Sequence, residues 1–281
     1  MAEPRNTGNI ADLPPLRDII QRYDLRAQKS LGQHFLLDSN LTGRIARQAG
    51  NIEEVNILEI GPGPGGLTRA LLEQGAKSVT AIEKDRRCVD ALTHLTDAYP
   101  GRLTVLEADA LRYDPGGVPA PRMIVSNLPY NISAPLIIKW LGAIEGLERL
   151  VIMVQKEVAD RLAAAPGNKT YGRLSVITQW LCEVDIAFNV DPRAFTPPPK
   201  VVSSVVTLVP RPEPLAPARW RYLEAVTAAA FNQRRKMLRA SLKAMNFDFE
   251  ALEIAPTARA EELSVPEFCR LARALEAARE D

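Results

Sequence analysis

Five short apolar runs, most of them separated by helical stretches, constrain the fold of this chain more than any other feature. They are rich in Val and Ile and read VNILEI (55–60), SVTAIE (78–83), LTVLEA (103–108), RMIVSN (122–127) and RLVIMV (149–154). Buried strands that alternate with helices favour a parallel sheet covered on both faces. Ligands of such open sheets bind outside the carboxyl ends of the strands, so a functional site is expected in the residues after each run.

Composition adds few further limits. The chain has 281 residues, of which 46% are hydrophobic and 25% charged, and this length accommodates a second, smaller domain. No stretch approaches the ~20 consecutive apolar residues of a membrane span, and the N-terminus lacks the apolar stretch of a signal peptide, so we expect a cytoplasmic protein with no membrane partner. Three scattered cysteines and two histidines without a ligand cluster predict neither disulfides nor a metal site.

The first apolar run leads into a glycine-rich loop, EIGPGPGGLT (59–68). Without Cβ atoms, Gly61 and Gly63 allow the tight turn and close backbone approach that a nucleotide-like ligand requires. Together with Gly66 they also satisfy the G-x-G-x-x-G spacing of a nicotinamide dehydrogenase, which stays an alternative. A tight turn that binds nothing is a third interpretation.

Acidic side chains stand at three successive strand ends. Glu59 lies two residues before the first glycine, Glu83 ends the second run, and Asp109 follows the third. Glu83 suits a ribose diol, Glu59 an ammonium-bearing ligand, and Asp109 an adenine amino group. Such an acidic rim fits a cationic methyl donor better than a pyrophosphate. Lys84 and Ala110, each next to one of these acids, are assigned to the same predicted donor site, and so is Asn127 at the end of the fourth run.

The fourth run is broken by the tetrapeptide Asn127, Leu128, Pro129 and Tyr130. The Asn127 side-chain oxygen and the Leu128 carbonyl offer two hydrogen-bond acceptors in sequence, and Pro129 restricts the direction of that carbonyl. Tyr130 adds a flat aromatic face. The alternative is a strand cap formed by an Asn turn.

Six motifs together carry a resemblance to a known family. They are GQHFL (32–36), EIGPGPGGLT (59–68), NLPYNIS (127–133), YGRLS (171–175), FTPPPKV (195–201) and FNQRRKMLR (231–239). Their order and spacing resemble those of the small-subunit ribosomal RNA adenine dimethyltransferases over nearly the whole chain beyond the first two dozen residues. The resemblance implies a Rossmann-like α/β methyltransferase sheet with a small all-α C-terminal domain, and S-adenosylmethionine as cofactor. It further implies a role in ribosome biogenesis, with the small ribosomal subunit as partner and two adjacent adenosines in a hairpin loop near the 3′ end of its RNA as substrate.

The implied adenosine substrate gives the tetrapeptide 127–130 a role. Adenine N6 is a poor nucleophile because its lone pair is delocalised, so an enzyme that modifies it needs acceptors that favour a more tetrahedral nitrogen. The Asn127 side-chain oxygen and the Leu128 carbonyl are suited to this task, and Tyr130 to stacking on a base taken out of its stack.

The resemblance also assigns residues outside the strand ends. Gln33, His34 and Leu36 match an N-terminal lid over the methionine end of the donor, and Phe195 packs against the flipped adenine from another side. The alternative is that Phe195 has a purely structural role and fills the core beneath a loop. Many relatives have Asn in place of His34 and Asp in place of Val202, so both positions depart from the family pattern.

Beyond the proline-rich junction PRPEPLAPAR (210–219), apolar residues recur at helical spacing. Residues 231–243 contain five basic residues and no acid, namely Arg234, Arg235, Lys236, Arg239 and Lys243. Arg235, Arg239 and Lys243 recur every four residues and so share one face of the predicted helix, which suits a row of phosphates. Such a run is often only a solvated face, but the resemblance favours RNA contact.

We therefore expect an N-terminal arm and donor lid (1–40), a Rossmann-like methyltransferase domain (41–210) and a helical RNA-binding domain (211–281), acting as a monomer. Two alternatives to small-subunit dimethylation remain on a similar scaffold. One is a macrolide-resistance methylase that modifies large-subunit RNA, and the other is a noncatalytic nucleic-acid-binding factor.

Overall fold

The computed structural model describes residues 13–28 and 33–280, so Gly32 of the GQHFL motif and the first part of the expected arm lie outside the described residues. The described residues form two compact units. The first comprises those of 1–136, 143–156 and 186–208, and the second those of 137–142, 157–185 and 209–281. Two segments that precede residue 211 thus belong to the second unit, and the expected three-part division stays a prediction.

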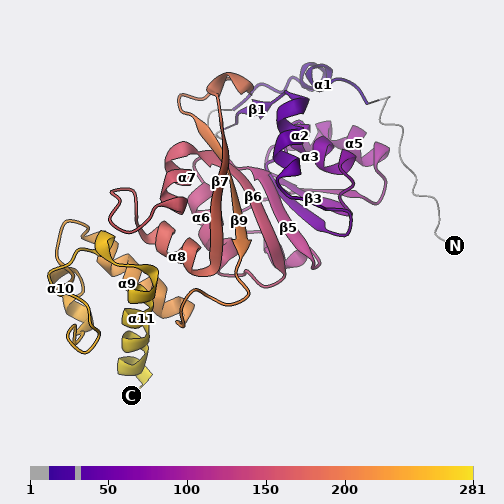
Figure 1. Cartoon of the computed structure of the whole chain (residues 1–281). Coiled ribbons are helices and arrows are strands. Elements are labelled where there is room, and N and C mark those ends of the chain that lie inside the picture. Colours follow the sequence, from indigo (N-terminus) through magenta and orange to yellow (C-terminus); the bar gives the residue numbers. More distant parts are fainter. Residues whose placement is uncertain (1–12, 29–32, 281) are drawn as a thin grey trace. The chain divides into compact units, whose positions relative to one another are not determined.

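A seven-stranded sheet lies mostly in the first unit and forms the core of that unit (Figure 1). Its order is β4-β3-β2-β5-β6-β9-β7, in which the first five strands are parallel and β9 is antiparallel to β6. The strands are β2 (Asn56–Ile60), β3 (Ser78–Glu83), β4 (Leu103–Glu107), β5 (Arg122–Asn127), β6 (Leu147–Gln155), β7 (Cys182–Val190) and β9 (Ser203–Pro210). The five expected strands are confirmed apart from one or two residues at their ends.

Helices connect most of the parallel strands, as the alternating pattern predicts. Helix α3 (Gly66–Glu73) joins β2 to β3, α4 (Arg86–Ala91) and α5 (Thr93–Ala98) join β3 to β4, and α6 (Ser133–Leu141) joins β5 to β6. Helix α2 (Ser39–Arg47) precedes β2, α7 (Lys156–Ala163) follows β6, and a short 3-10 helix (Pro115–Gly117) stands between β4 and β5. Helix α3 packs against β3, and α4 and α5 pack against β4. Strand β2 is buried along its whole length, as expected for a central strand covered on both faces.

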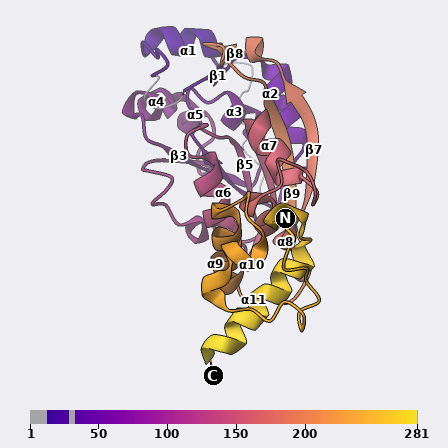
Figure 2. The same ribbon diagram turned by 90° about the vertical axis from the view of Figure 1, so that its left-hand side faces the viewer.

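The N-terminal segment packs on one edge of the first unit. It contains α1 (Leu16–Arg22) and the short strand β1 (Phe35–Leu36), which pairs antiparallel with β8 (Phe195–Thr196) (Figure 2). Ile19, Leu25 and Phe35 form an apolar cluster with Cys88 and Ala91 of α4. Burial of these side chains holds the segment beside the strand ends.

The sheet has a topological switch point between β2 and β5. Backbone pairing of β2 with β5 stops at Leu58 and Ile124, whereas pairing of β2 with β3 continues to Ile60. Where β2 and β5 separate, the buried Ser126 hydroxyl donates to the Ile60 carbonyl at 2.6 Å and accepts from the Ile60 N–H at 3.3 Å. A ligand crevice is expected at this point of an open α/β sheet.

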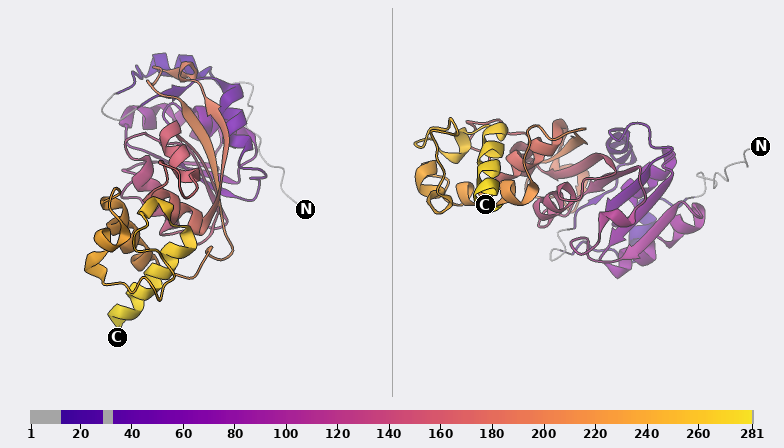
Figure 3. Two further views of the ribbon diagram at one scale, coloured as in Figure 1. Left: turned by 60° about the vertical axis from the view of Figure 1, so that its left-hand side comes forward. Right: turned by 90° about the horizontal axis from the view of Figure 1, so that it is seen from below.

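The second unit is helical. Its main helices are α8 (Arg173–Leu181), α9 (Trp220–Asn232), α10 (Leu238–Ser241) and α11 (Val265–Glu280). The orange α9 and the yellow α11 pack side by side (Figure 3), and the rings of Phe231 and Phe268 lie 5.5 Å apart between them. Within the part of the chain that the structure describes, no helix is long and apolar enough to span a membrane.

Candidate active site

A cavity opens at the carboxyl ends of β2, β3 and β5, and all of its lining belongs to the first unit. The lining includes every residue predicted to bind the donor: Gln33, His34, Leu36, Glu59, Gly61, Gly63, Glu83, Lys84, Asp109, Ala110 and Asn127. Leu128, Pro129 and Tyr130 line the same cavity. Residues from five separate stretches of sequence thus meet at the switch point, while the role of each stays a prediction.

Glu83 is fixed against the glycine loop. Its Oε2 accepts from the Gly63 N–H at 3.1 Å, and its Oε1 accepts from the N–H groups of Lys84 and Asp85, both at 2.8 Å. Gly63 has a positive φ of 55°, and a Cβ there would lie 3.1 Å from the Phe35 ring, so both the backbone and the available space favour glycine. Burial raises the pKa of Glu83, and the three backbone donors partly oppose this rise. The carboxylate is therefore held in one orientation at the cavity.

Glu59 has a different environment. Its side chain is 1% exposed, and its Oε2 has no hydrogen-bond partner among the described residues. The pKa of Glu59 is raised to about 8. Burial is the main cause, interaction with Thr68 partly opposes the rise, and the nearby Glu83 carboxylate adds to it. An unpaired buried carboxylate is unfavourable, so a cation entering the cavity would stabilise the ionised form of Glu59.

Asp109 is paired at the edge of the cavity. Its Oδ2 accepts from Lys84 Nζ at 3.0 Å and its Oδ1 from the Leu111 N–H at 3.0 Å. The Lys84 ammonium is the main reason that the pKa of Asp109 is lowered. The carboxylate is thus ionised and oriented, with Lys84 as its counter-ion.

The Asn127 side chain is oriented by the N-terminal segment. Its Nδ2 donates to the His34 carbonyl at 3.3 Å, and its Oδ1 makes no hydrogen bond with the described residues. The next residue, Leu128, donates its N–H to the Met153 carbonyl of β6 at 3.1 Å. The end of β5 therefore presents a free amide oxygen to the cavity, as the acceptor hypothesis requires.

Three rings gather beside this amide. The His34 ring stacks on Tyr130 with centroids 5.5 Å apart and meets the Phe195 ring edge-on at 6.3 Å. His34 Nδ1 donates to the Pro197 carbonyl at 2.7 Å, and the Tyr130 hydroxyl is hydrogen-bonded to Ser203 Oγ at 2.6 Å. Phe195 is only 3% exposed and is absent from the described cavity lining. Its contact with a target base stays a prediction.

The prediction that Arg235, Arg239 and Lys243 share one face of a continuous helix is wrong. Helix α9 ends at Asn232, residues 233–236 form a turn, and a new helix begins only at Leu238. The N–H groups of Leu238 and Arg239 donate to the carbonyls of Ala258 and Pro256, so these bonds replace a continued helical ladder. Tertiary contacts have overridden the local helical pattern here.

The five basic residues consequently have two environments. Arg234 forms an ion pair with Glu261 at 2.7 Å and donates to the Tyr171 carbonyl at 2.7 Å. The other four, Arg235, Lys236, Arg239 and Lys243, are exposed and form no ion pair with another described residue. Only these four are free to meet a polyanion without breaking an internal contact.

Solved structures of similar fold place the chain in a class of enzymes. A dimethyladenosine transferase from Plasmodium falciparum superposes with a TM-score of 0.74 and 28% identity, covering 85% of this chain and 96% of that one. The 23S rRNA methyltransferase ErmE gives a TM-score of 0.68 and 29% identity, covering 86% and 99%. The fold is therefore that of a methyltransferase.

Sequence comparison narrows the class to a family. The family described as ribosomal RNA adenine dimethylase matches residues 24–277, and the chain belongs to it. The ribosomal RNA small subunit methyltransferase A of Paramagnetospirillum magneticum is 61% identical over 272 residues, which are 95% of this chain and 97% of that protein. The protein of the same name from Rhodospirillum rubrum is 60% identical over 271 residues, covering 95% and 94%.

Proposed function

We propose that this chain dimethylates N6 of two adjacent adenosines in the 3′-terminal hairpin loop of small-subunit ribosomal RNA, with S-adenosylmethionine as methyl donor. Membership of the adenine dimethylase family supports the reaction, and about three-fifths identity to two proteins named small subunit methyltransferase A supports the substrate. The small ribosomal subunit is accordingly the proposed partner.

The orientation of Asn127 is the observation that carries the proposal. Because its Nδ2 is engaged by the His34 carbonyl, its Oδ1 is the atom left to accept a hydrogen bond from the cavity. Beside it, Pro129 restricts the backbone that presents the Leu128 carbonyl. These two acceptors hold the N6 hydrogens of adenine and favour a nitrogen whose lone pair points at the donor.

The acids at the strand ends fit the donor. S-adenosylmethionine supplies a methyl group on a positively charged sulfonium and also carries an ammonium group. The unpaired Oε2 of Glu59 is suited to that positive charge, and Glu83 to the ribose hydroxyls. Asp109, with Lys84 as counter-ion, is assigned to the adenine end of the donor.

The reaction does not require a general base among the residues of the cavity. Methyl transfer forms a bond between N6 and the methyl carbon and breaks the bond between that carbon and sulfur. N6 then carries an excess proton, which is acidic and passes to water. Tyr130, whose hydroxyl is tied to Ser203, provides a stacking surface for the target base. Phe195 supports this surface indirectly, because its ring contacts the His34 ring, which in turn stacks on Tyr130.

RNA binding is assigned to Arg235, Lys236, Arg239 and Lys243 of the second unit. They are exposed, lack internal ion pairs among the described residues and lie in a segment without acids. Exposed cations of this kind bind phosphates and release condensed counterions. Arg234 is left out of this surface because Glu261 and Tyr171 already engage it.

Methylation of large-subunit RNA is the second candidate, since ErmE has a similar fold at 29% identity. The far higher identity to the small-subunit enzymes favours the first candidate. The test is a transfer assay in which labelled S-adenosylmethionine is offered to small subunits and large subunits that lack the modifications. We expect label on small subunits only, mapped by mass spectrometry to two neighbouring adenosines as dimethyladenosine. Label on the large subunit, or none at all, would contradict the proposal.

A further inference from the structure

Asp85 lies next to the donor cavity but is absent from its described lining. It is the N-cap of α4, and its side chain is 6% exposed. The carboxylate accepts from the Arg87 N–H and Nε at 3.1 Å, from Arg87 Nη2 at 2.7 Å and from Gln33 Nε2 at 3.0 Å. One buried carboxylate therefore joins α4 to the N-terminal segment.

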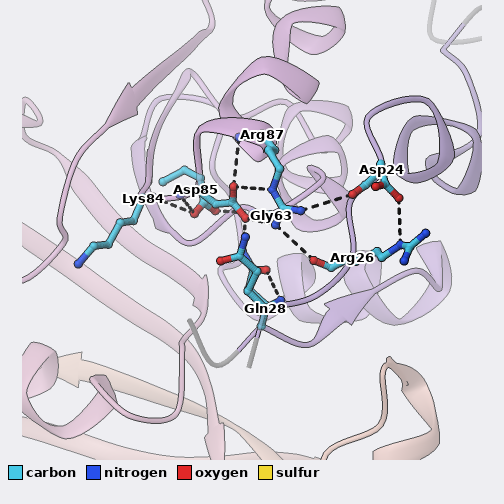
Figure 4. Close-up of polar contacts among 9 residues, drawn as sticks. Asp24, Arg26, Gln28, Gly63, Lys84, Asp85 and Arg87 are labelled. Atoms are coloured by element: carbon cyan, nitrogen blue, oxygen red, sulfur yellow. Dashed lines mark hydrogen bonds and ion pairs between the residues drawn. The ribbon is translucent and has the colours of Figure 1, made fainter. Parts of the chain in front are cut away.

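Arg87 extends this connection along the same segment (Figure 4). Its Nη2 donates to the Arg26 carbonyl at 3.3 Å and its Nη1 to the Asp24 carbonyl at 3.4 Å. The side chain of Arg87 thus lies between Asp85 and two backbone carbonyls that precede the cavity-lining residues. A lysine has too few donors in the right geometry to replace this guanidinium.

Gln33 is held at both ends of its amide. Its Nε2 donates to Asp85, and its Oε1 accepts from the Gln28 N–H at 2.9 Å. Gln33 lines the cavity, and both polar atoms of its amide already have a partner within the protein. A contribution of Gln33 to donor binding therefore comes from its position more than from a polar contact of its own.

The same network reaches the acid assigned to the donor ribose. The Asp85 N–H donates to Glu83 Oε1 at 2.8 Å, so Asp85 bonds to Glu83 through its backbone and to Gln33 through its side chain. The position of the N-terminal segment and the orientation of the Glu83 carboxylate are thereby connected through one residue.

We propose that Asp85 and Arg87 are positioning residues that hold Gln33, which lines the donor cavity, together with residues 24–28, which precede it in the chain, and so slow the escape of bound donor. They act through the segment that they anchor and touch neither substrate. The identity of the donor rests on the proposed function above, whereas the anchoring of the segment does not.

The chain contains a matched control at the next position. Arg86 belongs to the same helix and carries the same charge, but its side chain is 70% exposed and pairs with Asp90 at 2.9 Å and Glu107 at 3.0 Å. Neither partner belongs to the N-terminal segment. Arg86→Met and Arg87→Met therefore remove the same charge from neighbouring sites, and only the second removes the anchor.

The experiment measures donor binding and chemistry separately on full-length variants. Arg87→Met should raise the Kd for S-adenosylmethionine about tenfold, mainly through faster dissociation, since a charge-assisted hydrogen bond contributes on this scale. Its single-turnover rate at saturating donor should stay within about twofold of wild type, because no group that contacts the reacting atoms is changed. Arg86→Met should match wild type in both measurements.

Two further measurements keep the proposal testable if Arg87→Met misfolds or if S-adenosylmethionine is not the donor. They are donor release in a second variant and amide hydrogen exchange in the ligand-free protein. Asp85→Asn keeps an N-cap acceptor but loses the charge, and it should also speed donor release. In the ligand-free protein, amide exchange at Gln28 and Gln33 should be faster in Arg87→Met than in Arg86→Met. Equal exchange in the two variants, or equal donor release, would overturn the proposed anchor. If wild type bound no S-adenosylmethionine, the proposed function would fail, and the exchange comparison would still decide the anchor.

Discussion

The donor cavity of the first unit and the basic segment of the second unit are built in opposite ways. Glu59 and Glu83 at the cavity are buried, and three backbone N–H groups orient the Glu83 carboxylate. The four exposed basic residues, Arg235, Lys236, Arg239 and Lys243, lie in a turn and two short helical stretches, and they form no ion pair with another described residue. The difference teaches that this protein forms its small-molecule site in advance, whereas its proposed RNA surface relies on charge.

The largest effect is expected from reversing the charge of the basic segment. Changing Arg235, Arg239 and Lys243 together to Glu should weaken binding to the small subunit by on the order of 10³-fold, since three phosphate contacts are lost and repulsion is added. Donor affinity should be unchanged. Binding measured across a salt series would check the mechanism, because each neutral replacement should flatten the plot of log affinity against log salt by about 0.7–0.9. Wild-type binding by the triple variant would reduce the segment to a solvated face.

A change at the end of β5 should separate chemistry from binding within the cavity. Asn127→Ala removes the free amide oxygen and should lower the single-turnover methyl-transfer rate by about 10²-fold or more, by analogy with other preorganised hydrogen bonds. Titration with S-adenosylmethionine should give nearly the wild-type Kd. A variant that transferred methyl groups at most of the wild-type rate would remove Asn127 from the proposed mechanism.

Glu59 makes the stability of the first unit depend on pH. Its folded-state pKa of about 8 lies above the ordinary value of 4.5, so the folded protein keeps a proton that the unfolded chain has released. The free energy of unfolding should therefore fall as pH rises between these two values, by up to about 1.4 kcal/mol per pH unit from this residue. Denaturant unfolding of wild type and Glu59→Gln across that range checks the sign. A slope that is identical in both proteins would show that Glu59 is not the cause.

The smallest effect is expected on stability, where two neighbouring residues of the basic segment, Arg234 and Arg235, should differ. Arg234→Met should lower the free energy of unfolding by about 1–2 kcal/mol, because it removes the contacts to Glu261 and to the Tyr171 carbonyl. Arg235→Met, one residue further on, should stay within about 0.5 kcal/mol of wild type. Thermal or denaturant unfolding of the two variants distinguishes them. Equal stabilities would mean that Arg234 is as available to RNA as its neighbour.

The cavity could be predicted from the sequence because topology fixes where parallel strands end. Glu59, Glu83 and Asn127 are far apart along the chain, yet each ends or nearly ends a buried strand, and such ends meet at one edge of the sheet. The strands β7 and β9 were not predicted. The alternating pattern gave no sign of them, since β9 follows a proline-rich loop and β7 follows α8 directly.

Contacts between distant segments were the part that sequence did not reveal. Nothing local indicates that the backbone of residues 237–239 pairs with residues 256–259, so a continuous helix was expected there. The Asp85–Arg87 network was missed for a similar reason. Its partners Gln33 and Asp24 lie more than fifty residues away, and a DRR sequence after a strand is an ordinary N-cap signal.

The separation of donor capture from RNA binding is tested most directly by measuring both affinities on two variants side by side. Glu83→Ala should weaken S-adenosylmethionine binding by roughly 1.5–3 kcal/mol, the range for hydrogen bonds to a charged group, and leave the affinity for the small subunit at its wild-type value. The Arg235, Arg239 and Lys243 triple Glu variant should give the reverse pattern, with normal donor affinity and lost subunit binding. If either variant lost both affinities, or if Glu83→Ala bound donor normally, the division of labour between the two regions would be wrong.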